Sequence, residues 1–543
     1  MTPPIRGADA LLRALRTAGV DTIFTLSGNH IMPVFDAALD HDIRLIHTRH
    51  EAAAVHMADA YARLTGTCGV ALVTGGQGHT NAVAALPTAL AGEVPVLLLS
   101  GHAPLGEIGL GAFQELDNAA IAAPLCKHSA VASSAAALPG ELAAAIRAAR
   151  SGRPGPVHLS LPTDVLDART DPAAITWPAA AAFQPISMPL MPETGASIRA
   201  AIATAARPLV LTPPALCTPD GRATLAHLAT ALGVPVLPMQ SPRGLNDPSL
   251  GATAEMFARA DLIVLLGKAM DFTLRYGRPP SFAPDARWIA IDPDGEMLAR
   301  AARALGKRLI LAALAAPAEA AEALAAGPQM SAHAAWAAEV AGAIAWRPPS
   351  WAALRQGSAP IHPVTLCAAI APHLGATTVL VSDGGEIGQW AQSLLGHAAP
   401  VVNGVAGAIG ASIPFAIAAR QARPQATVIA VLGDGTFGFH MAEFDTALRH
   451  SLPFVAVVGN DSRWNAEHQI QLREYGAQRA HSCELAPATR YDLVVQALGG
   501  HGEYVIDAAD LPAALERAIA SGKPACVNVM IDGQPAPTLR QPN

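Results

Sequence analysis

Residues 428–438 of the chain read VIAVLGDGTFG, and residues 454–462 read FVAVVGNDS. Each stretch begins with an apolar, β-branched run that is typical of a buried strand, and each ends in residues that favour a turn. The helical pattern at 441–450 lies between them, which predicts a strand–helix–strand unit of a parallel sheet. Ligands of such sheets bind beyond the carboxyl ends of the strands. The aspartate between two glycines and the Asn-Asp pair are therefore expected at the same edge.

The same alternation of strands and helices recurs in three blocks of the 543-residue chain. It predicts an α/β protein with three doubly wound parallel-sheet domains. We expect an N-terminal domain over 1–170, a central domain over 193–340 and a C-terminal domain over 361–543. The Pro- and Ala-rich stretches 171–192 and 341–360 are predicted to be linkers.

The composition excludes several classes of protein. Hydrophobic residues make up 51% and charged residues 15% of the chain, which excludes a disordered one. The net charge is −7, and no basic stripe is present, so a nucleic-acid partner is not expected. The apolar runs have the length of strands, so no membrane span is expected. Six widely spaced cysteines without a CxxC pair, and a first segment without a signal-cleavage pattern, favour a reducing, cytoplasmic location.

The two strand ends carry the residues that a divalent cation and a phosphate group need. Asp434 offers a hard carboxylate, while Gly433 and Gly435 would let phosphate oxygens approach the backbone. Asn460 or Asp461, together with a backbone carbonyl, would add further oxygen ligands. Mg²⁺ prefers few carboxylates combined with substrate phosphates and water, so the pattern favours a Mg²⁺–diphosphate site.

The order strand, GDG, helix, strand, ND resembles the thiamin-diphosphate (ThDP) motif of the acetolactate synthase superfamily. The resemblance implies that Asp434, Asp461 and the backbone carbonyl of Arg463 bind Mg²⁺. It also implies the names of the three domains, which are pyrimidine-binding (PYR), central and diphosphate-binding (PP). The chain departs from the family at Asp461, where asparagine is usual, so Asn460 stays an alternative ligand.

Residues 49–66, RHEAAAVHMADAYARLTG, resemble the segment that carries the catalytic glutamate of ThDP enzymes. The resemblance implies that Glu51 bonds to N1′ of the cofactor's aminopyrimidine and promotes loss of the thiazolium C2 proton. On its own, a glutamate in a first helical turn could simply interact with the helix dipole. The resemblance further implies that Glu51 serves a cofactor held by a neighbouring subunit. A homodimer is then the minimum active unit, with its active sites at the subunit interface, and a homotetramer is the expected assembly.

Residues 403–410, NGVAGAIG, resemble the family's loop that bends the cofactor. The resemblance implies that the Gly407 carbonyl accepts from the 4′-amino group and that Ile409 pushes the cofactor into its V shape. Gly384 and Gly385 follow a predicted strand at the position where relatives bind the diphosphate. The predicted cofactor-binding residues are Glu51, Gly384, Gly385, Gly407, Ile409, Gly433, Asp434, Gly435, Thr436 and Asp461.

Two residues of the PYR domain are candidates for contact with the substrate. His30 matches a histidine that benzaldehyde lyase uses for proton transfer, which implies an acid/base or oxyanion-binding role. Gln114 matches an active-site glutamine in the same relatives and could hold a substrate oxygen as an uncharged donor. The alternative is that either residue only stabilises its loop.

The resemblance implies a ThDP- and Mg²⁺-dependent lyase or transferase that acts on a small carbonyl substrate. Its reaction would make or break a carbon–carbon bond in 2-oxo acids or 2-hydroxy carbonyl compounds, as acetolactate synthase-like and benzaldehyde lyase-like carboligases do. The alternatives are a 2-hydroxyacyl-CoA lyase or oxalyl-CoA decarboxylase type of enzyme, and a non-catalytic ThDP-binding scaffold. Related proteins use the central domain for FAD, for ADP or for no ligand. Asp292 could accept a ribose hydroxyl there, but no GxGxxG fingerprint supports a nucleotide.

Overall fold

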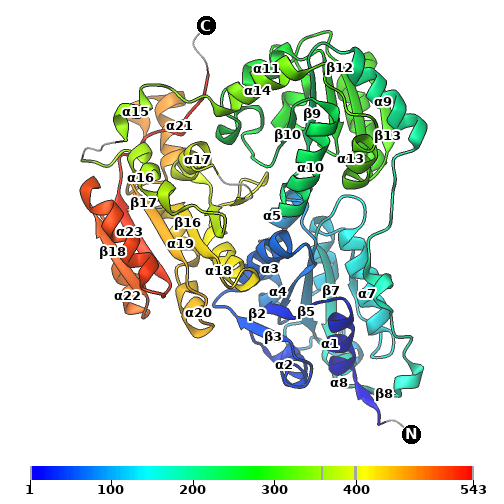
Figure 1. Cartoon of the computed structure of the whole chain (residues 1–543). Helices are drawn as coiled ribbons and strands as arrows, with labels where there is room; N and C mark the ends of the chain where they lie inside the picture. The colour runs from blue at the N-terminus through cyan, green and yellow to red at the C-terminus, as the bar shows by residue number, and fades with distance from the viewer. Residues whose placement is uncertain (1–2, 356–358, 397–399, 541–543) are drawn as a thin grey trace. The chain divides into compact units, whose positions relative to one another are not determined.

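The computed structural model describes residues 3–355, 359–396 and 400–540 (Figure 1). Its strands form three parallel sheets and one small antiparallel ribbon of β1 (Ile5–Arg6) and β8 (Arg169–Thr170). Helices alternate with the strands throughout, which confirms the predicted α/β class with three parallel sheets. All six cysteines are free thiols, as their spacing indicates.

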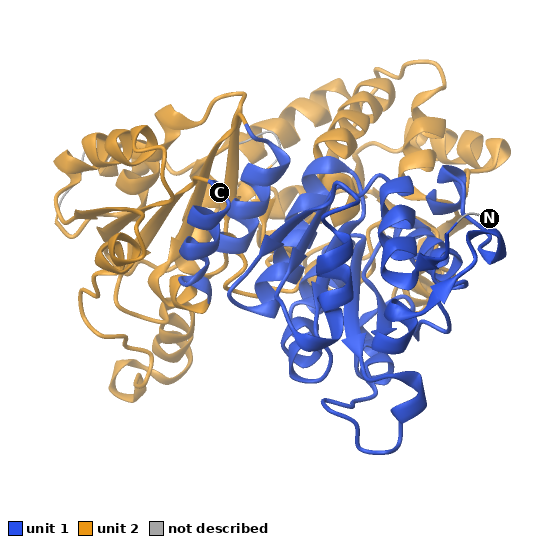
Figure 2. Cartoon of the chain, turned by 90° about the horizontal axis from the view of Figure 1, so that it is seen from below, with its two compact units in different colours: residues 1–186, 413–424, 440–452 blue, residues 187–412, 425–439, 453–543 orange. Residues whose placement is uncertain are grey.

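The chain forms two compact units (Figure 2). The first unit consists of residues 1–186, 413–424 and 440–452, and the second contains the remainder. Two segments from the last third of the sequence therefore belong with the first 186 residues. Each of the three predicted domains contains one parallel sheet. The domain boundaries stay predictions.

The first unit is built on a six-stranded parallel sheet. Its strand order is β3 (Arg44–His47), β2 (Thr22–Thr25), β4 (Gly69–Val73), β5 (Val96–His102), β7 (Val157–Pro162) and β6 (Ser129–Val131). Leu11, Leu15, Leu142 and Ile146 of α1 and α7 join the core formed with the strands. The helices are α1 (Gly7–Thr17), α2 (Met32–Ala37), α3 (Glu51–Thr65), α4 (Gln77–Val83), α5 (Leu86–Ala91), α6 (Asn118–Ala122), α7 (Leu138–Arg150), α8 (Thr163–Asp167), α18 (Ser412–Ala422) and α20 (Glu443–Arg449).

The second unit contains a five-stranded and a six-stranded parallel sheet. The first has the order β10 (Val236–Pro238), β9 (Pro208–Thr212), β11 (Leu262–Leu266), β12 (Arg287–Asp292) and β13 (Leu309–Leu314). The second has the order β15 (Val401–Val402), β14 (Thr378–Ser382), β16 (Thr427–Gly433), β17 (Val455–Asn460), β19 (Ala525–Met530) and β18 (His501–Val505). The inner strands of both sheets are short, mostly apolar and buried, as expected for sheets covered on both faces. The edge strands β13 and β18 are partly exposed, and β18 contains polar residues.

Helices connect the strands of both sheets in the second unit. Around the five-stranded sheet they are α9 (Pro192–Thr204), α10 (Pro219–Leu232), α11 (Ala254–Arg259), α12 (Gly295–Leu305), α13 (Pro317–Ala325) and α14 (Ala334–Ala345). The rest are α15 (Trp351–Leu354), α16 (Pro363–Ile370), α17 (Gly385–Leu394), α19 (Asp434–His440), α21 (Asn465–Tyr475), α22 (Tyr491–Ala497) and α23 (Leu511–Ala520). None of the helices in the described ranges is both long enough and apolar enough to span a membrane.

Two details differ from the sequence pattern. A helix already begins at Asp434 and not at 441, so Asp434 and Gly435 lie in the first helical turn, directly after Gly433 at the end of β16. A glycine-flanked aspartate can continue directly into a helix because its carboxylate stabilises the N-terminal turn. In addition, α14 extends to Ala345, past the start of the predicted linker at 341. Its alanines favour the helix, and the proline pair that follows ends it.

Candidate active site

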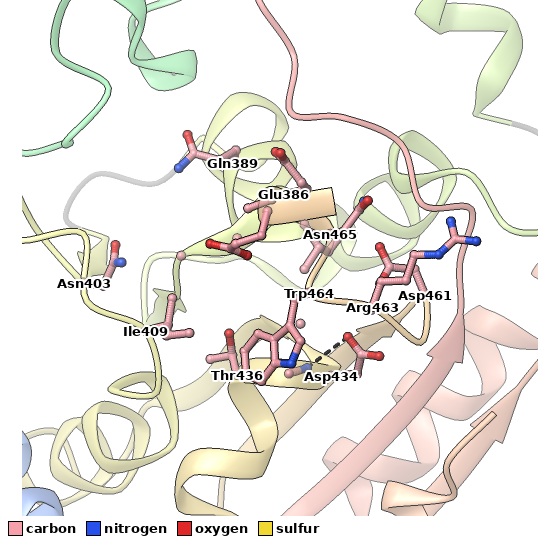
Figure 3. A pocket seen from close by; sticks show the side chains of 18 of the residues that line it. Glu386, Gln389, Asn403, Ile409, Asp434, Thr436, Asp461, Arg463, Trp464 and Asn465 are labelled. Atoms are coloured by element: carbon pink, nitrogen blue, oxygen red, sulfur yellow. Dashed lines mark hydrogen bonds between the residues drawn. The ribbon is translucent and has the colours of Figure 1, made fainter. Parts of the chain in front are cut away.

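The carboxyl ends of three neighbouring strands in the second unit surround one pocket. β14, β16 and β17 are adjacent and parallel, so the residues that follow them meet at the same edge. The pocket has a volume of about 190 Å³. Its lining includes every cofactor- and metal-site residue predicted for this part of the chain except Asn460: Gly384, Gly385, Gly407, Ile409, Gly433, Asp434, Gly435, Thr436, Asp461 and Arg463. Figure 3 shows Asp434 and Asp461 on one side of the pocket and Ile409 on the other.

Asp434 is a buried carboxylate with one unsatisfied oxygen. Its Oδ1 accepts the Gly435 N–H at 3.0 Å, whereas Oδ2 is buried without a hydrogen-bond partner among the described residues. Burial raises the pKa of Asp434 to about 6. Burial, and then the charge of Asp434, raise the pKa of Asp461 to about 7. Two desolvated carboxylates beside a pocket, one with an orphaned oxygen, fit a cation that would compensate their charge.

The remaining ligands of such a cation must come from other oxygens. In the ranges that the structure describes, no group of three or more His, Cys, Asp or Glu side chains could hold a metal ion. A backbone carbonyl, as predicted for Arg463, and phosphate oxygens would complete the shell. Asn460 does not line the pocket. It is fully buried, and its amide donates to the Thr489 carbonyl and to Asn528 Oδ1, which disfavours it as the alternative ligand.

Glycines leave the space that a diphosphate needs. A Cβ at Gly384 would lie 2.9 Å from both Asn403 Nδ2 and Ile409 Cγ2, and a Cβ at Gly435 would lie 2.6 Å from the Trp464 ring. Gly385, at φ +74°, begins the ten-residue helix α17 and has open space beside it. A helix N-terminus with unused N–H groups at the pocket is a favourable place for a phosphate. The pocket therefore fits a diphosphate with its counter-cation.

Asp383 organises this wall and was missed by the sequence analysis. Its carboxylate is fully buried and accepts the N–H groups of Gly384 at 2.6 Å, Gly410 at 3.1 Å and Ser412 at 3.0 Å. It thereby joins the turn before α17 to the loop that carries Ile409. Burial raises the pKa of Asp383, and the three N–H donors oppose that shift. The only signal in the sequence was its position at the end of a strand.

Glu386 and Arg243 also line the pocket, although neither was predicted as an individual site residue. Glu386 is buried, which raises its pKa, and the Arg243 guanidinium at 3.7 Å opposes the rise. Its Oε2 also accepts the Ala536 N–H at 2.7 Å, so the C-terminal tail is held at the pocket. Two further side chains bind the backbone of the tail. The Gln469 amide donates to the Gly533 carbonyl, and the Asn465 amide donates to the Gln534 carbonyl.

Glu51 lies in the first unit as the first residue of α3. The helix forms because an alanine-rich run follows His50, whose ring accepts the Ala52 N–H, and it ends at Gly66 in the left-handed region. Glu51 is 9% exposed, and Asn81 Nδ2 donates to its Oε2 at 3.0 Å. A Cβ at Gly78 would lie 3.4 Å from Oε1, so glycine keeps the space beside that oxygen open.

His30 and Gln114 follow different strands of the same sheet and lie close together. A Cβ at Gly75 would lie 3.4 Å from His30 Nδ1, and a Cβ at Gly76 would lie 2.6 Å from the Gln114 Cβ. His30 is 3% exposed, its Nδ1 pairs with Thr74 Oγ1 at 3.1 Å, and burial lowers its pKa. Its imidazole is therefore uncharged at neutral pH. Gln114 adopts φ +55°, a left-handed conformation that holds its loop in a tight turn.

The candidate nucleotide residue of the central domain is not available to a ligand. Asp292 is only 4% exposed, and its Oδ1 accepts the Asp294 N–H at 3.0 Å. At the end of the neighbouring strand, a Cβ at Gly267 would lie 2.4 Å from Pro317. These contacts do not favour FAD or ADP at this strand edge.

Comparison with known proteins identifies the family. Residues 5–121 match the N-terminal TPP-binding domain of thiamine pyrophosphate enzymes, 196–308 their central domain and 383–529 their C-terminal TPP-binding domain. The chain belongs to the thiamine pyrophosphate enzymes. It is 34% identical to a probable acetolactate synthase of Mycobacterium bovis, over 96% of this chain and 95% of that protein. It is 32% identical to human 2-hydroxyacyl-CoA lyase 2, over 91% of this chain and 84% of that protein.

These matches confirm the resemblance. The protein is a ThDP-dependent enzyme, a lyase or transferase related to acetolactate synthases and 2-hydroxyacyl-CoA lyases. A non-catalytic scaffold is therefore not the preferred interpretation.

Proposed function

We propose that the enzyme uses ThDP with Mg²⁺ to make or break a carbon–carbon bond beside the carbonyl of a 2-oxo acid or a 2-hydroxy carbonyl compound. The observation that carries the proposal is the pocket in which Asp434 presents a buried, unsatisfied oxygen next to a glycine-lined wall. When bound, ThDP supplies the nucleophilic carbon and the electron sink. Asp434, Asp461 and the Arg463 carbonyl would hold Mg²⁺, and the first N–H groups of α17 would bind a phosphate.

Other side chains orient the cofactor and move protons. Ile409, fixed next to Gly384, would bend the cofactor, and the Gly407 carbonyl would accept from its amino group. Glu51 would exchange a proton with the pyrimidine nitrogen at Oε1, because Asn81 already bonds to Oε2. A buried carboxylate with one oxygen held and the other beside a glycine is suited to this transfer.

His30 and Gln114 would act on the substrate oxygen. The two residues are close, and both come from loops at the strand ends of the first unit. An uncharged imidazole and an amide can orient a carbonyl oxygen and donate to it as negative charge develops. Thr74 Oγ1 already bonds to Nδ1 of His30, which fixes the orientation of the ring.

The Glu51→Gln variant tests the proposal. Glutamine keeps the size of the side chain but cannot exchange a proton, so we expect ThDP to bind while C2 proton exchange slows by roughly 10²- to 10⁴-fold. NMR of the bound cofactor after transfer to D₂O measures this rate. An unchanged rate would exclude the proposed role of Glu51.

A second candidate is a 2-hydroxyacyl-CoA lyase. A hollow of about 810 Å³ in the second unit is lined by Arg275, Arg278 and Arg540 together with Tyr276. Arginines beside an aromatic ring suit a phosphorylated, nucleotide-bearing group. Assays of CO₂ release from 2-oxo acids and of aldehyde release from 2-hydroxyacyl-CoA and benzoin-type compounds would separate the two activities. Turnover of the CoA esters alone would favour this candidate.

We also propose that the active unit is at least a homodimer, with a tetramer as the expected assembly. In that arrangement Glu51 of one subunit and Asp434 of another serve the same cofactor. Mixing the inactive variants Glu51→Gln and Asp434→Ala under conditions of subunit exchange should restore up to about one quarter of the wild-type activity, as expected when hybrid dimers carry one intact site. The absence of any recovery would contradict shared sites.

A further inference from the structure

The segment that leads into Glu51 is held by α20, although the two lie almost 400 residues apart in the sequence. His47 is bonded on both sides: its N–H donates to His450 Nε2 at 2.9 Å, and its carbonyl accepts from Arg449 Nη2 at 2.7 Å. Arg44 Nη2 donates to the His450 carbonyl at 2.9 Å. We call α20 with His450 the clasp. It binds the end of β3 and the loop that follows.

Glu443 is the residue of the clasp that binds the backbone just before Glu51. Its side chain is 1% exposed, and its two carboxylate oxygens accept the Arg49 N–H at 3.0 and 3.1 Å. Thr446 Oγ1 donates to Oε2 at 2.6 Å. Arg49 stands two residues before Glu51, and His50 between them caps α3. Glu443 therefore fixes the backbone from which the first turn of α3 starts.

The first turn of a helix has N–H groups without partners in the helix, and a carboxylate close to that end is stabilising. A hydrogen bond from a backbone N–H to a charged carboxylate also constrains direction. Because Glu51 is the first residue of α3, the angle at which the chain enters the helix sets where its carboxylate lies. Asn81 fixes only one oxygen of that carboxylate.

We propose that Glu443 is a positioning residue for Glu51: its ionised carboxylate holds the Arg49 backbone and thereby fixes the start of α3. This inference rests on the role proposed for Glu51 above, but its structural part, the ordering of residues 47–56, does not depend on the cofactor.

The chemical state of Glu443 makes the clasp sensitive to pH. Burial raises the pKa of Glu443 to about 7, while Thr446 and the backbone N–H groups of Arg49 and His50 oppose the rise. As the pH falls through this value, the carboxylate gains a proton and its bond to Arg49 weakens. The charged and titratable groups around it are Asp445 and Arg449 on α20, His47, Arg49 and His50 on the facing loop, His440 and His56 near His50, and His450 with Arg44 at the far end.

The test uses Glu443→Gln, with Glu141→Gln as matched control. Glu141 also accepts a backbone N–H and a hydroxyl, both from Ser133, but it lies on α7. Amide hydrogen exchange is measured on the cofactor-free protein. We expect residues 47–56 to exchange about tenfold faster in Glu443→Gln and at the wild-type rate in the control. Equal protection of this segment in both variants would overturn the inference.

A second readout separates positioning from general stability. The kcat is measured at saturating Mg²⁺ and ThDP, because a bound cation keeps Asp434 and Asp461 ionised. Under these conditions the wild-type kcat should fall as the pH drops below about 7. The kcat of Glu443→Gln should be about 10- to 100-fold below the highest kcat of the wild type. It should not fall further in acid, because the amide carries no charge at any pH. If the kcat of the variant still falls below about pH 7, the proposal is wrong. If Glu443→Gln does not fold, Thr446→Val replaces it and should show smaller changes in the same direction. If Thr446→Val changes neither the hydrogen exchange of residues 47–56 nor the pH profile of kcat, the inference is overturned.

Two variants together separate a failure of the positioning role of Glu443 from a failure of the role proposed for Glu51. If Glu51→Gln leaves C2 proton exchange unchanged, the role of Glu51 is wrong whatever Glu443 does. If Glu51→Gln abolishes that exchange while Glu443→Gln changes neither protection nor pH profile, only the positioning role is wrong.

Discussion

Replacing Asp461 with asparagine tests the one position at which the proposed metal site departs from the family pattern. Asp461 and Asp434 both line the pocket, and the pKa of Asp461 is raised to about 7 by burial and then by the charge of Asp434. In the cofactor-free protein at alkaline pH, both carboxylates are ionised without a compensating cation. Asparagine keeps the shape and one oxygen ligand but removes one of the two charges. We therefore expect Asp461→Asn to stabilise the cofactor-free protein.

The size of the effect follows from the shift in the pKa of Asp461. A rise from 3.8 to about 7 corresponds to about 4 kcal/mol of lost stability once the group is ionised. Asp461 is half-buried, so solvent screening reduces the expected gain to about 2 kcal/mol. Between the two pKa values the folded chain binds a proton that the unfolded chain has lost, so stability falls as the pH rises toward 7. The gain from asparagine should thus be small at about pH 4 and complete at about pH 8.

Denaturant unfolding of both proteins at these two pH values, each with and without Mg²⁺ and ThDP, measures the difference. The gain should disappear when the cation and the diphosphate are bound, because the metal compensates the charge of Asp461 in the wild type. Turnover at saturating cofactor should stay within about threefold of the wild type, since asparagine can supply an oxygen ligand. A variant that is no more stable at alkaline pH, or equally stabilised at acid pH, would refute the reasoning.

Three further substitutions probe the other parts of the site. Asp434→Ala should weaken ThDP binding at least roughly 100-fold and abolish its dependence on Mg²⁺; calorimetry that shows equal affinity with and without Mg²⁺ in the wild type would contradict the metal assignment. His30→Ala should lower kcat by about 10- to 1,000-fold with ThDP affinity unchanged. Gln114→Ala should change the ranking of donor substrates by about tenfold, as expected for one lost hydrogen bond, without changing the melting temperature. Steady-state kinetics with several substrates tests the predictions for His30 and Gln114. Unchanged rates would mean that the two residues only stabilise their loops.

The local parts of the fold could be predicted from the sequence. The strands β14, β16 and β17 are short apolar runs bounded by glycine, and a parallel sheet brings the ends of such runs to one edge. This is why Gly384, Asp434 and Asp461 meet at one pocket as predicted. The argument that favours Asp461 over Asn460 as the proposed metal ligand needed the structure. Consecutive residues at a strand end point to opposite faces, and only the contacts of Asn460 with Thr489 and Asn528 show which one is buried.

The residues that hold the site in place could not be read from local patterns. Asp383 accepts N–H groups from Gly410 and Ser412, and Glu443 accepts one from Arg49, so their roles depend on long-range packing that no spacing reveals. Along the chain, α19 starts at Asp434, a proposed cation ligand, and ends at His440. Only residues 441–442 separate it from α20, which forms the clasp with His450. A cation that orders the first turn of α19 would therefore limit the conformations open to α20. Mg²⁺ binding and the order of residues 47–56 should then be linked, and each should strengthen the other by the same factor.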